Sequence, residues 1–215
     1  MNWKKKLLQR LKLYIILDKD TLKNKNIFRI ASNIKKSGAA IVQLRDKNSP
    51  KVDILKKARR LKSLLKGNKI LFIINDYVEI AQLVDADGLH LGQEDLPLEA
   101  ARRILGKDKI IGISCHNLKQ ARQAQKGGAD YIGVGPIFST PTKPEYKPIG
   151  INLLKDIAKN AKIPVFAIGG INSHNLNEIV SQDIGCGIAV CRDVCLSRNP
   201  LASIKALKEI LDDTD

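Results

Sequence analysis

Hydroxyl and ammonium side chains alternate with prolines in "STPTKP", residues 139–144, directly after the apolar run "YIGVGPIF" at residues 131–138. Such groups donate hydrogen bonds to phosphate oxygens, and an ammonium group adds a full positive charge. Thr140, Thr142 and Lys143 are therefore candidate ligands for two phosphate groups. The hydroxyls would contact one phosphate and the lysine the other.

A second group of polar side chains lies in "QLRDK", residues 43–47. Gln43, Arg45 and Lys47 occupy alternate positions, and side chains at alternate positions of a strand point to the same side. One amide and two cations in a row favour an anionic ligand. A strand end that faces solvent can also carry these residues without a ligand.

Two acidic residues follow the next two apolar runs, Asp76 in "IINDY" and Asp95 in "HLGQEDLP". At the ends of adjacent strands they would converge, and because two carboxylates repel each other, a cation between them is expected. Mg²⁺ is commonly bound by one or two carboxylates together with water and phosphate oxygens. The alternative is that each acid caps the N-terminus of the following helix.

Glycines and backbone amides offer another anion site in the last quarter of the chain. Gly169 and Gly170 in "AIGGIN" allow a phosphate to approach the backbone closely, and Cys191 and Arg192 in "CRDV" offer further amides. Oriented N–H groups of this kind bind anions. The sequence thus predicts two kinds of anion-binding group.

Eight short apolar runs must position these residues, and segments with helical spacing separate the runs. The runs cover residues 13–17, 41–45, 70–76, 88–92, 110–116, 131–138, 164–170 and 186–191. Repeated strand, helix, strand units imply right-handed crossovers and a parallel sheet. They predict an α/β fold, a (β/α)8 TIM barrel forming a single domain over residues 1–215. A doubly wound open sheet is the alternative, but its glycine-rich fingerprint after the first strand is absent.

In such barrels the chemistry lies at the C-terminal ends of the strands, and the loops after strands seven and eight commonly bind phosphate. All the candidates above lie at such ends, and so do Ser114 and His116 in "GISCHN". A lone histidine at a strand end is more often a hydrogen-bonded structural residue than a base. His90 in "GLHLG" is likewise expected to be packed.

The chain is basic, with 37 Lys and Arg against 22 acidic residues and a net charge of +15, which favours anionic partners. The lysines are scattered over predicted helix faces and aromatic residues make up only 4%, so a nucleic-acid partner is not expected. No run approaches the ~20 apolar residues of a membrane span, and no membrane partner is expected. The basic start "MNWKKKLLQRLK" lacks the features of a secretory signal and predicts a short N-terminal amphipathic helix.

The four cysteines contain no CxxC pair; they are Cys115, Cys186, Cys191 and Cys195. Their expected role is that of small apolar fillers in a reducing compartment, and a metal cluster is not expected. These features predict a cytoplasmic protein.

Several motifs closely resemble those of the thiamine phosphate synthase (thiamine-phosphate pyrophosphorylase) family. They are, in this order and at these intervals, "QLRDK", "INDY", "ADGLHLGQEDLP", "GISCHN", "GADYIGVGPIFSTPTK" and "AIGGIN". The resemblance implies an Mg²⁺-dependent transferase that joins 4-amino-2-methyl-5-(diphosphooxymethyl)pyrimidine to a thiazole phosphate and releases diphosphate. It also implies a dissociative displacement without a covalent enzyme intermediate, because a diphosphate leaving group needs charge neutralisation rather than a nucleophile.

The resemblance assigns roles to residues by motif. The pyrimidine diphosphate would be held by Gln43, Leu44, Arg45, Asp46, Lys47, Asn75, Ser114 and Lys143. The thiazole phosphate would be held by Thr140, Pro141, Thr142, Gly170 and the backbone of Cys191 and Arg192. Asp76 and Asp95 would bind Mg²⁺. The catalytic residues would be Arg45, Lys47, Lys143 and Ser114.

Two positions depart from the family pattern, and two rival functions remain. Arg192 stands where small or hydroxyl residues are more common, and Tyr77 where Arg or Asp is common.

A thiazole tautomerase shares the barrel, but would not be expected to combine Lys47, the two aspartates and the Thr-Pro-Thr-Lys loop. A non-catalytic nucleic-acid binder would lose affinity steeply with salt. The sequence leaves open whether the thiazole phosphate is carboxylated and whether the chain forms a homodimer.

Overall fold

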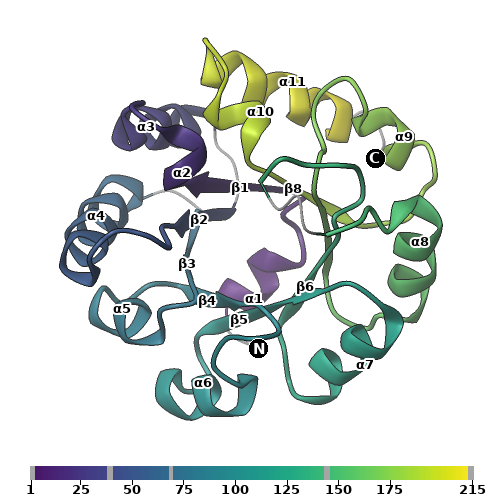
Figure 1. The fold of residues 1–215 in the computed structure, drawn as a ribbon, viewed down its shortest axis with the longest axis horizontal. Helices are drawn as coiled ribbons and strands as arrows, with labels where there is room; N and C mark the ends of the chain where they lie inside the picture. The colour runs from purple at the N-terminus through teal and green to yellow at the C-terminus, as the bar shows by residue number, and fades with distance from the viewer. Residues whose placement is uncertain (1–2, 38–40, 68–69, 143–145, 213–215) are drawn as a thin grey trace.

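A computed structural model of the chain describes residues 3–37, 41–67, 70–142 and 146–212. Eight parallel strands form one closed barrel in which each strand pairs with its neighbours in sequence and the last pairs with the first (Figure 1). The strands are β1 (Leu13–Asp18), β2 (Ile41–Arg45), β3 (Leu71–Asn75), β4 (Gly88–Leu91), β5 (Ile110–Cys115), β6 (Tyr131–Val134), β7 (Val165–Ile168) and β8 (Gly187–Val190). The predicted TIM barrel is confirmed, and the open-sheet alternative is excluded.

Helices surround the barrel and connect successive strands (Figure 1). They are α1 (Trp3–Leu8), α2 (Lys19–Leu22), α3 (Ile27–Ser37), α4 (Lys51–Leu65), α5 (Val78–Leu83), α6 (Leu98–Leu105), α7 (Leu118–Lys126), α8 (Gly150–Asn160), α9 (Leu176–Val180), α10 (Arg192–Cys195) and α11 (Pro200–Asp212). Within the described ranges, none of these helices has both the length and the apolar character needed to cross a membrane.

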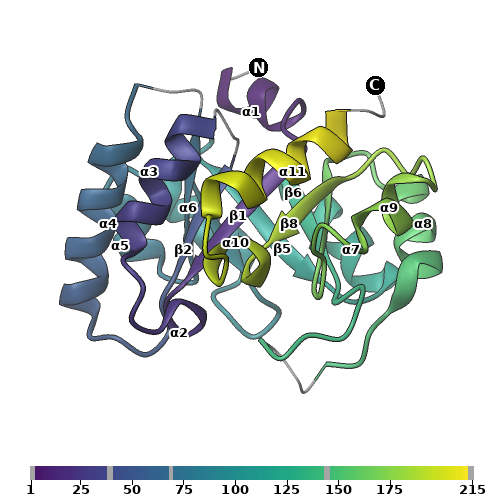
Figure 2. The same ribbon diagram turned by 90° about the horizontal axis from the view of Figure 1, so that it is seen from above.

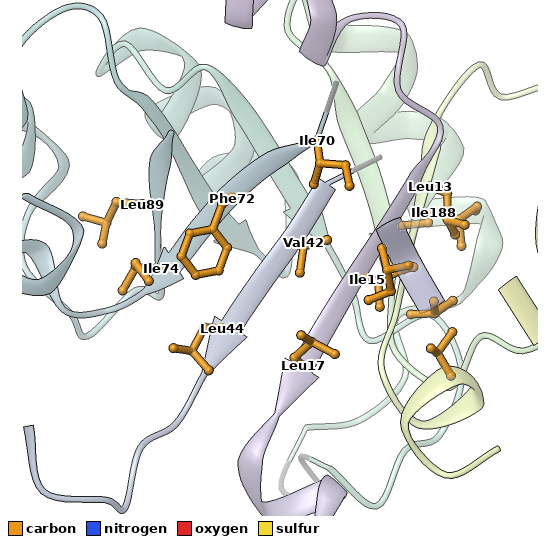
Figure 3. Packing of buried hydrophobic residues seen from close by; sticks show 14 of the residues in the cluster. Leu13, Ile15, Leu17, Val42, Leu44, Ile70, Phe72, Ile74, Leu89 and Ile188 are labelled. Carbon is orange, nitrogen blue, oxygen red and sulfur yellow. The ribbon is translucent and has the colours of Figure 1, made fainter. Parts of the chain in front are cut away.

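Each strand buries both of its faces, which explains why the runs are apolar without strict alternation. In β1, Leu13, Ile15 and Leu17 point outward and pack in the large core between barrel and helices (Figure 3). Tyr14 and Ile16 alternate with them and belong to a smaller core inside the barrel. The period of two along a strand therefore divides each run between two hydrophobic cores.

Three aromatic rings fill the inside of the barrel. The ring of Phe166 packs edge-on against Tyr14 and Tyr131, with 5.5 Å between ring centroids in each case. Tyr131 fits because β5 carries Gly112 beside it, where a Cβ would lie 2.0 Å from the Tyr131 ring. The barrel is thus a packed core and leaves space for ligands only at its ends.

The N-terminal helix α1 closes one end of the barrel, and α2 lies at the opposite end, where β1 finishes (Figure 2). Leu8 is 2% exposed and joins the inner core. Lys4 lies 2.8 Å from a carboxylate oxygen of Asp87 and Lys5 lies 2.6 Å from one of Asp130. The predicted amphipathic helix is confirmed, and it contacts the barrel itself.

The main difference from the expected elements concerns the sixth strand, which stops at Val134 although the apolar run continues to residue 138. Pro136 has no backbone N–H to offer a neighbouring strand. Beyond it the chain leaves the barrel, and Ile137 and Phe138 donate backbone hydrogen bonds to the end of β7 and the glycine after it. The loop that carries the threonines therefore begins directly after Val134, with Gly135 and Pro136.

Candidate active site at the barrel mouth

A cavity of about 310 Å³ opens at the C-terminal end of the barrel, opposite α1. It is lined by residues from strand ends and from the loops that follow them. The predicted site residues among its lining are Arg45, Ser114, Thr140, Pro141, Thr142, Gly170, Cys191 and Arg192. Residues from five different strand–loop units thus meet in one space, as the barrel rule predicts.

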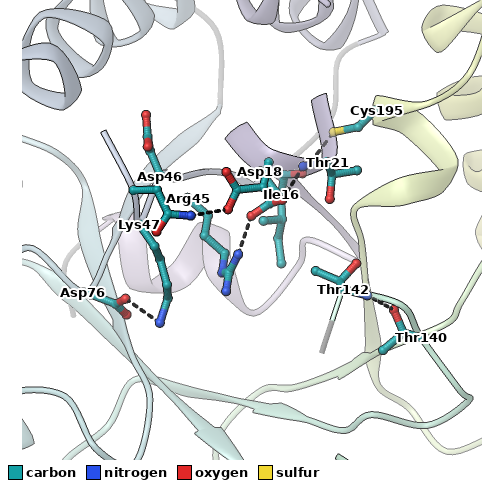
Figure 4. Close-up of polar contacts among 12 residues, drawn as sticks. Ile16, Asp18, Thr21, Arg45, Asp46, Lys47, Asp76, Thr140, Thr142 and Cys195 are labelled. Atoms are coloured by element: carbon teal, nitrogen blue, oxygen red, sulfur yellow. Dashed lines mark hydrogen bonds and ion pairs between the residues drawn. The ribbon is translucent and has the colours of Figure 1, made fainter. Parts of the chain in front are cut away.

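Arg45 is held at the cavity wall by Asp18, a residue that the sequence analysis did not single out. The strand register places the two side by side at the ends of β1 and β2, and Arg45 donates a hydrogen bond from its guanidinium to the Asp18 carboxylate (Figure 4). Asp18 also accepts a hydrogen bond from the backbone N–H of Thr21 at 2.8 Å. Because Asp18 is 2% exposed, this charge is buried and paired, which fixes the direction of the arginine.

The two aspartates that are predicted to bind a cation lie close together after the ends of β3 and β4. Asp76 contacts the ammonium of Lys47 at 3.0 Å (Figure 4), and its side chain also contacts that of Asp95. Burial, and then the neighbouring Asp95 carboxyl, raise the pKa of Asp76 to about 6, although Lys47 opposes the change. Two acids that share one place in this way fit a divalent cation, which would relieve their repulsion.

The helix-capping alternative is not what the structure shows. The N-cap residues of α5 and α6 are Tyr77 and Pro97, and neither cap makes a side-chain hydrogen bond. Asp76 has a positive φ of 62°, which is unusual for a residue with a side chain. Asp95 accepts a hydrogen bond from the N–H of Gly92 at 2.6 Å. Across the described ranges, no three His, Cys, Asp or Glu side chains gather as a metal cluster, so water or ligand oxygens would have to complete the coordination.

A chain of hydrogen bonds crosses the inside of the barrel and links two predicted residues. Ser114 contacts Nε2 of His90 at 2.9 Å, and His90 Nδ1 contacts the Tyr131 hydroxyl at 2.9 Å. The chain continues to the Tyr14 hydroxyl at 2.8 Å, which accepts a hydrogen bond from the Gln43 amide at 2.6 Å. Burial raises the pKa of both tyrosines, so their hydroxyls stay protonated.

This chain confirms that His90 is a hydrogen-bonded interior residue. The sequence gives only a weak signal for the interior residues of this chain, which are Tyr14, His90 and Tyr131. Each is an isolated polar group in an apolar run, so the sequence could show only that its side chain points into the barrel. His116 also has a structural role: its Nδ1 contacts the Gly135 carbonyl, and its ring stacks on Tyr146 with centroids 4.7 Å apart.

The opposite wall of the cavity is built by the loops after β6, β7 and β8. Gly169 and Gly170 have φ values of 100° and 69°, in the region that favours glycine. A Cβ on Gly170 would lie 2.6 Å from the Ser139 carbonyl oxygen. The two glycines thus let the β6 and β7 loops touch, and this contact brings Thr140 and Thr142 to the cavity. The Thr140 hydroxyl accepts a hydrogen bond from the Thr142 N–H at 3.3 Å (Figure 4).

Several predicted residues do not line this cavity; they are Gln43, Leu44, Asp46, Lys47, Asn75, Asp76 and Asp95. Leu44 points outward into the large core (Figure 3), and the Asp46 carboxylate pairs with Lys57 on α4. Leu44 and Asp46 alternate with Gln43 and Arg45, so their side chains point to the opposite face of the sheet, away from the barrel interior. Only the backbone of these two residues could contact a ligand in the cavity. Asn75 is 7% exposed at the end of β3. Lys143 lies outside the described residues.

Comparisons with known proteins concern the sequence and the fold of the chain. A family model described as thiamine monophosphate synthase matches residues 13–194. Thiamine-phosphate synthase from Coprothermobacter proteolyticus is 42% identical over 211 residues, covering 98% of this chain and all of the relative. The corresponding protein from Clostridium acetobutylicum is 42% identical over 179 residues, or 83% of this chain and 84% of the relative. The solved structure of thiamine phosphate pyrophosphorylase from Pyrococcus furiosus is 36% identical and superimposes with a TM-score of 0.87, covering 97% of this chain and 98% of that one.

Proposed function

The chain belongs to the thiamine monophosphate synthase family, whose members are transferases of thiamine biosynthesis, and on this premise we propose the reaction that it catalyses. The substrates are 4-amino-2-methyl-5-(diphosphooxymethyl)pyrimidine and a thiazole phosphate, with or without a carboxyl group. The products are thiamine phosphate and diphosphate, and a carboxylated thiazole phosphate would also release its carboxyl group as CO2. The reaction requires Mg²⁺.

One observation carries this proposal: a single cavity is lined both by Arg45, at the end of β2, and by Gly170 and Thr142, from the loops after β7 and β6. These two groups of residues form two walls of the site. Lys47 and its partner Asp76 lie outside this lining. Two anionic groups on two different molecules could therefore bind with their reacting ends between the walls, which supplies the proximity that a transfer reaction needs.

The chemistry that suits this site is dissociative. The bond between the pyrimidine methylene carbon and the diphosphate oxygen breaks, and the electron pair leaves with diphosphate. Arg45 and Lys47, together with Lys143, stabilise the negative charge that develops on the leaving group. The thiazole nitrogen then forms the new bond to the methylene carbon. Ser114 donates to the diphosphate, and its hydrogen bond with His90 fixes the position of its oxygen.

Asp76 and Asp95 are the residues that would hold Mg²⁺, and the ion would neutralise diphosphate oxygens when bound. The raised pKa of Asp76 supports this assignment, because its causes are burial and, second, the neighbouring Asp95 carboxyl, and a bound cation would oppose both effects. We also propose a cytoplasmic location, which is supported by the four free thiols of Cys115, Cys186, Cys191 and Cys195.

The deciding experiment incubates the purified protein with both substrates and Mg²⁺ and measures thiamine phosphate after oxidation to its fluorescent thiochrome derivative. We expect product that depends on both substrates and disappears with EDTA. Asp76→Ala and Asp95→Ala should each abolish the metal-dependent turnover. A folded wild-type protein that forms no product with either thiazole substrate would overturn the proposal, and near-normal turnover in both aspartate variants would overturn the metal assignment.

A further inference from the structure

Two cysteine thiols lie one helical turn apart at the β8 end of the cavity. Cys191 directly precedes α10 and Cys195 is its last residue, and the Cys195 N–H donates to the Cys191 carbonyl at 2.9 Å. Four residues advance roughly 6 Å along a helix, and a disulfide joins residues whose Cα atoms are roughly 4.4–6.8 Å apart. Each thiol also changes the pKa of the other. The two side chains are thus close enough to interact.

The two thiols differ in access and in acidity. Cys191 is half-buried and lines the substrate cavity, whereas Cys195 is fully buried and donates to the Ile16 carbonyl at 3.3 Å (Figure 4). The interaction with the Cys195 side chain, with a smaller contribution from Thr21, lowers the pKa of Cys191 despite burial and the nearby Asp18 carboxylate. The same interaction, together with burial, raises the pKa of Cys195. Cys191 is therefore placed to react first and Cys195 to react second.

The remaining cysteines provide an internal contrast. Cys115 and Cys186 do not line the cavity. Burial raises the pKa of Cys115 to about 12 and that of Cys186 to about 11. Both should stay protonated and unreactive under conditions in which Cys191 reacts.

We propose that Cys191 and Cys195 form an oxidation site in the wall of the substrate cavity, where a hydroperoxide converts the two thiols into a disulfide. The Cys191 thiolate sulfur attacks one peroxide oxygen, the O–O bond breaks, and the other oxygen leaves as an alcohol or water after taking up a proton. Cys191 is then a sulfenic acid. The Cys195 sulfur attacks the Cys191 sulfur, the S–O bond breaks, and the hydroxyl leaves with the Cys195 proton as water. Two thiols lose two electrons in total, and one peroxide gains them.

The consequence for catalysis rests on the proposed function. Cys191 and Arg192 belong to the wall that would receive the thiazole phosphate. A disulfide would draw the Cys191 side chain towards Cys195 and shift the backbone at the start of α10, so thiazole phosphate binding should weaken. A ligand on this wall would conversely cover Cys191, so thiazole phosphate should slow the oxidation.

The test treats reduced, folded protein with hydrogen peroxide, blocks remaining thiols with a maleimide under denaturing conditions, and maps the peptides by mass spectrometry. We expect two of the four thiols to disappear, a Cys191–Cys195 cross-link to appear, and dithiothreitol to reverse both changes. In Cys195→Ser, which keeps a hydrogen-bond donor, dimedone should trap a sulfenic acid on Cys191 without a disulfide. Cys186→Ser is the matched control and should form the disulfide at the wild-type rate.

Preferential oxidation of Cys115 or Cys186, or four unreacted thiols in folded wild-type protein, would overturn the proposal. The wild-type mapping does not depend on the folding of any variant. The cross-link is detected by mass and not by turnover, so a protein that makes no thiamine phosphate could still contain the oxidation site. Conversely, an active enzyme without the cross-link would refute only the oxidation site.

Discussion

Asp18 and Arg45 form a buried ion pair at the cavity wall, so the aspartate should control catalysis without touching substrate. In Asp18→Asn the amide oxygen can still accept the Thr21 N–H, but the charge that orients Arg45 is lost. A hydrogen bond to a charged group contributes about 1.5–3 kcal/mol, so we expect kcat/KM to fall roughly 10- to 100-fold. Steady-state kinetics with the thiochrome assay would measure this.

The control for this prediction is Asp85→Asn, because Asp85 pairs with Lys109 at the other end of the barrel. Its kinetics should match those of the wild type. If the two variants behaved alike, Asp18 would have only a general structural role.

Asp76 should lower the stability of the metal-free protein at neutral pH. Its pKa is raised from 3.8 to about 6 in the folded state, so the folded state holds the proton more tightly than the unfolded state does. The free energy of unfolding therefore falls as the pH rises through this interval, and the loss is complete above the folded pKa. Asp76→Asn removes this titration, so in EDTA its melting temperature relative to wild type should rise between about pH 4 and about pH 7.

Mg²⁺ should have the opposite effect on the same two proteins. Binding to the folded state raises the melting temperature, so wild type should gain stability from Mg²⁺ and Asp76→Asn should gain little. A variant that lost its turnover but showed neither thermal effect would indicate that Asp76 acts in some way other than holding a cation.

At the scale of elements, the contact between the β6 and β7 loops shapes the glycine-rich wall of the cavity, where we propose that thiazole phosphate binds. Gly170→Ala would place a Cβ 2.6 Å from the Ser139 carbonyl oxygen, so the loops would have to separate. A displacement of this kind near an active site lowers activity on the order of 10- to 100-fold. We expect most of the loss as a higher KM for thiazole phosphate, since Gly170 and the threonines share that wall.

Gly106→Ala is the matched control for the glycine variant. Gly106 also has a positive φ, 76°, but nothing lies within 4 Å of the site of its Cβ. It should lose roughly 1 kcal/mol of stability through backbone strain and keep its KM. Equal KM values in the two variants would show that the loop contact does not shape the site.

Helix α1 stabilises the barrel from the end that lies opposite the cavity. Leu8 fills the inner core, so Leu8→Ala should lower the free energy of unfolding by about 2–5 kcal/mol. Trp3→Ala, on the same helix but 59% exposed, should change it by no more than about 0.5 kcal/mol. Urea unfolding would measure the free energy of unfolding of both variants. Similar losses in the two variants would mean that Leu8 does not pack in the inner core.

At the scale of the whole molecule, the basic residues behind the large positive net charge are distributed over different parts of the fold. Of the 37 basic residues, some neutralise buried acids at the closed end, as Lys4 and Lys62 do with Asp87. Others, such as Arg45, line the cavity. The net charge therefore supports an anionic substrate without requiring an extended basic surface. The homodimer stays a prediction, which sedimentation of the intact chain would test.

The sequence by itself determined the eight strands and their order, because each run is apolar enough to be buried on both faces and each crossover has only one favoured hand. It also determined that the candidate residues follow strands, which in a barrel brings them to one end. The alternation within "QLRDK" predicted one shared role for Gln43, Arg45 and Lys47, and that role stays a prediction. In the structure their partners are Tyr14, Asp18 and Asp76 respectively.

Only the tertiary structure decided which partners these residues meet. The pairing of Asp18 with Arg45, the chain from Ser114 to Gln43, and the contact between Asp76 and Asp95 all join residues from different strands. Such contacts depend on the register between strands and on the closure of the barrel, and neither leaves a local pattern in the chain. The residue types therefore predicted which kind of ligand the site could bind. The closure and register of the barrel decided which of these side chains contact one another.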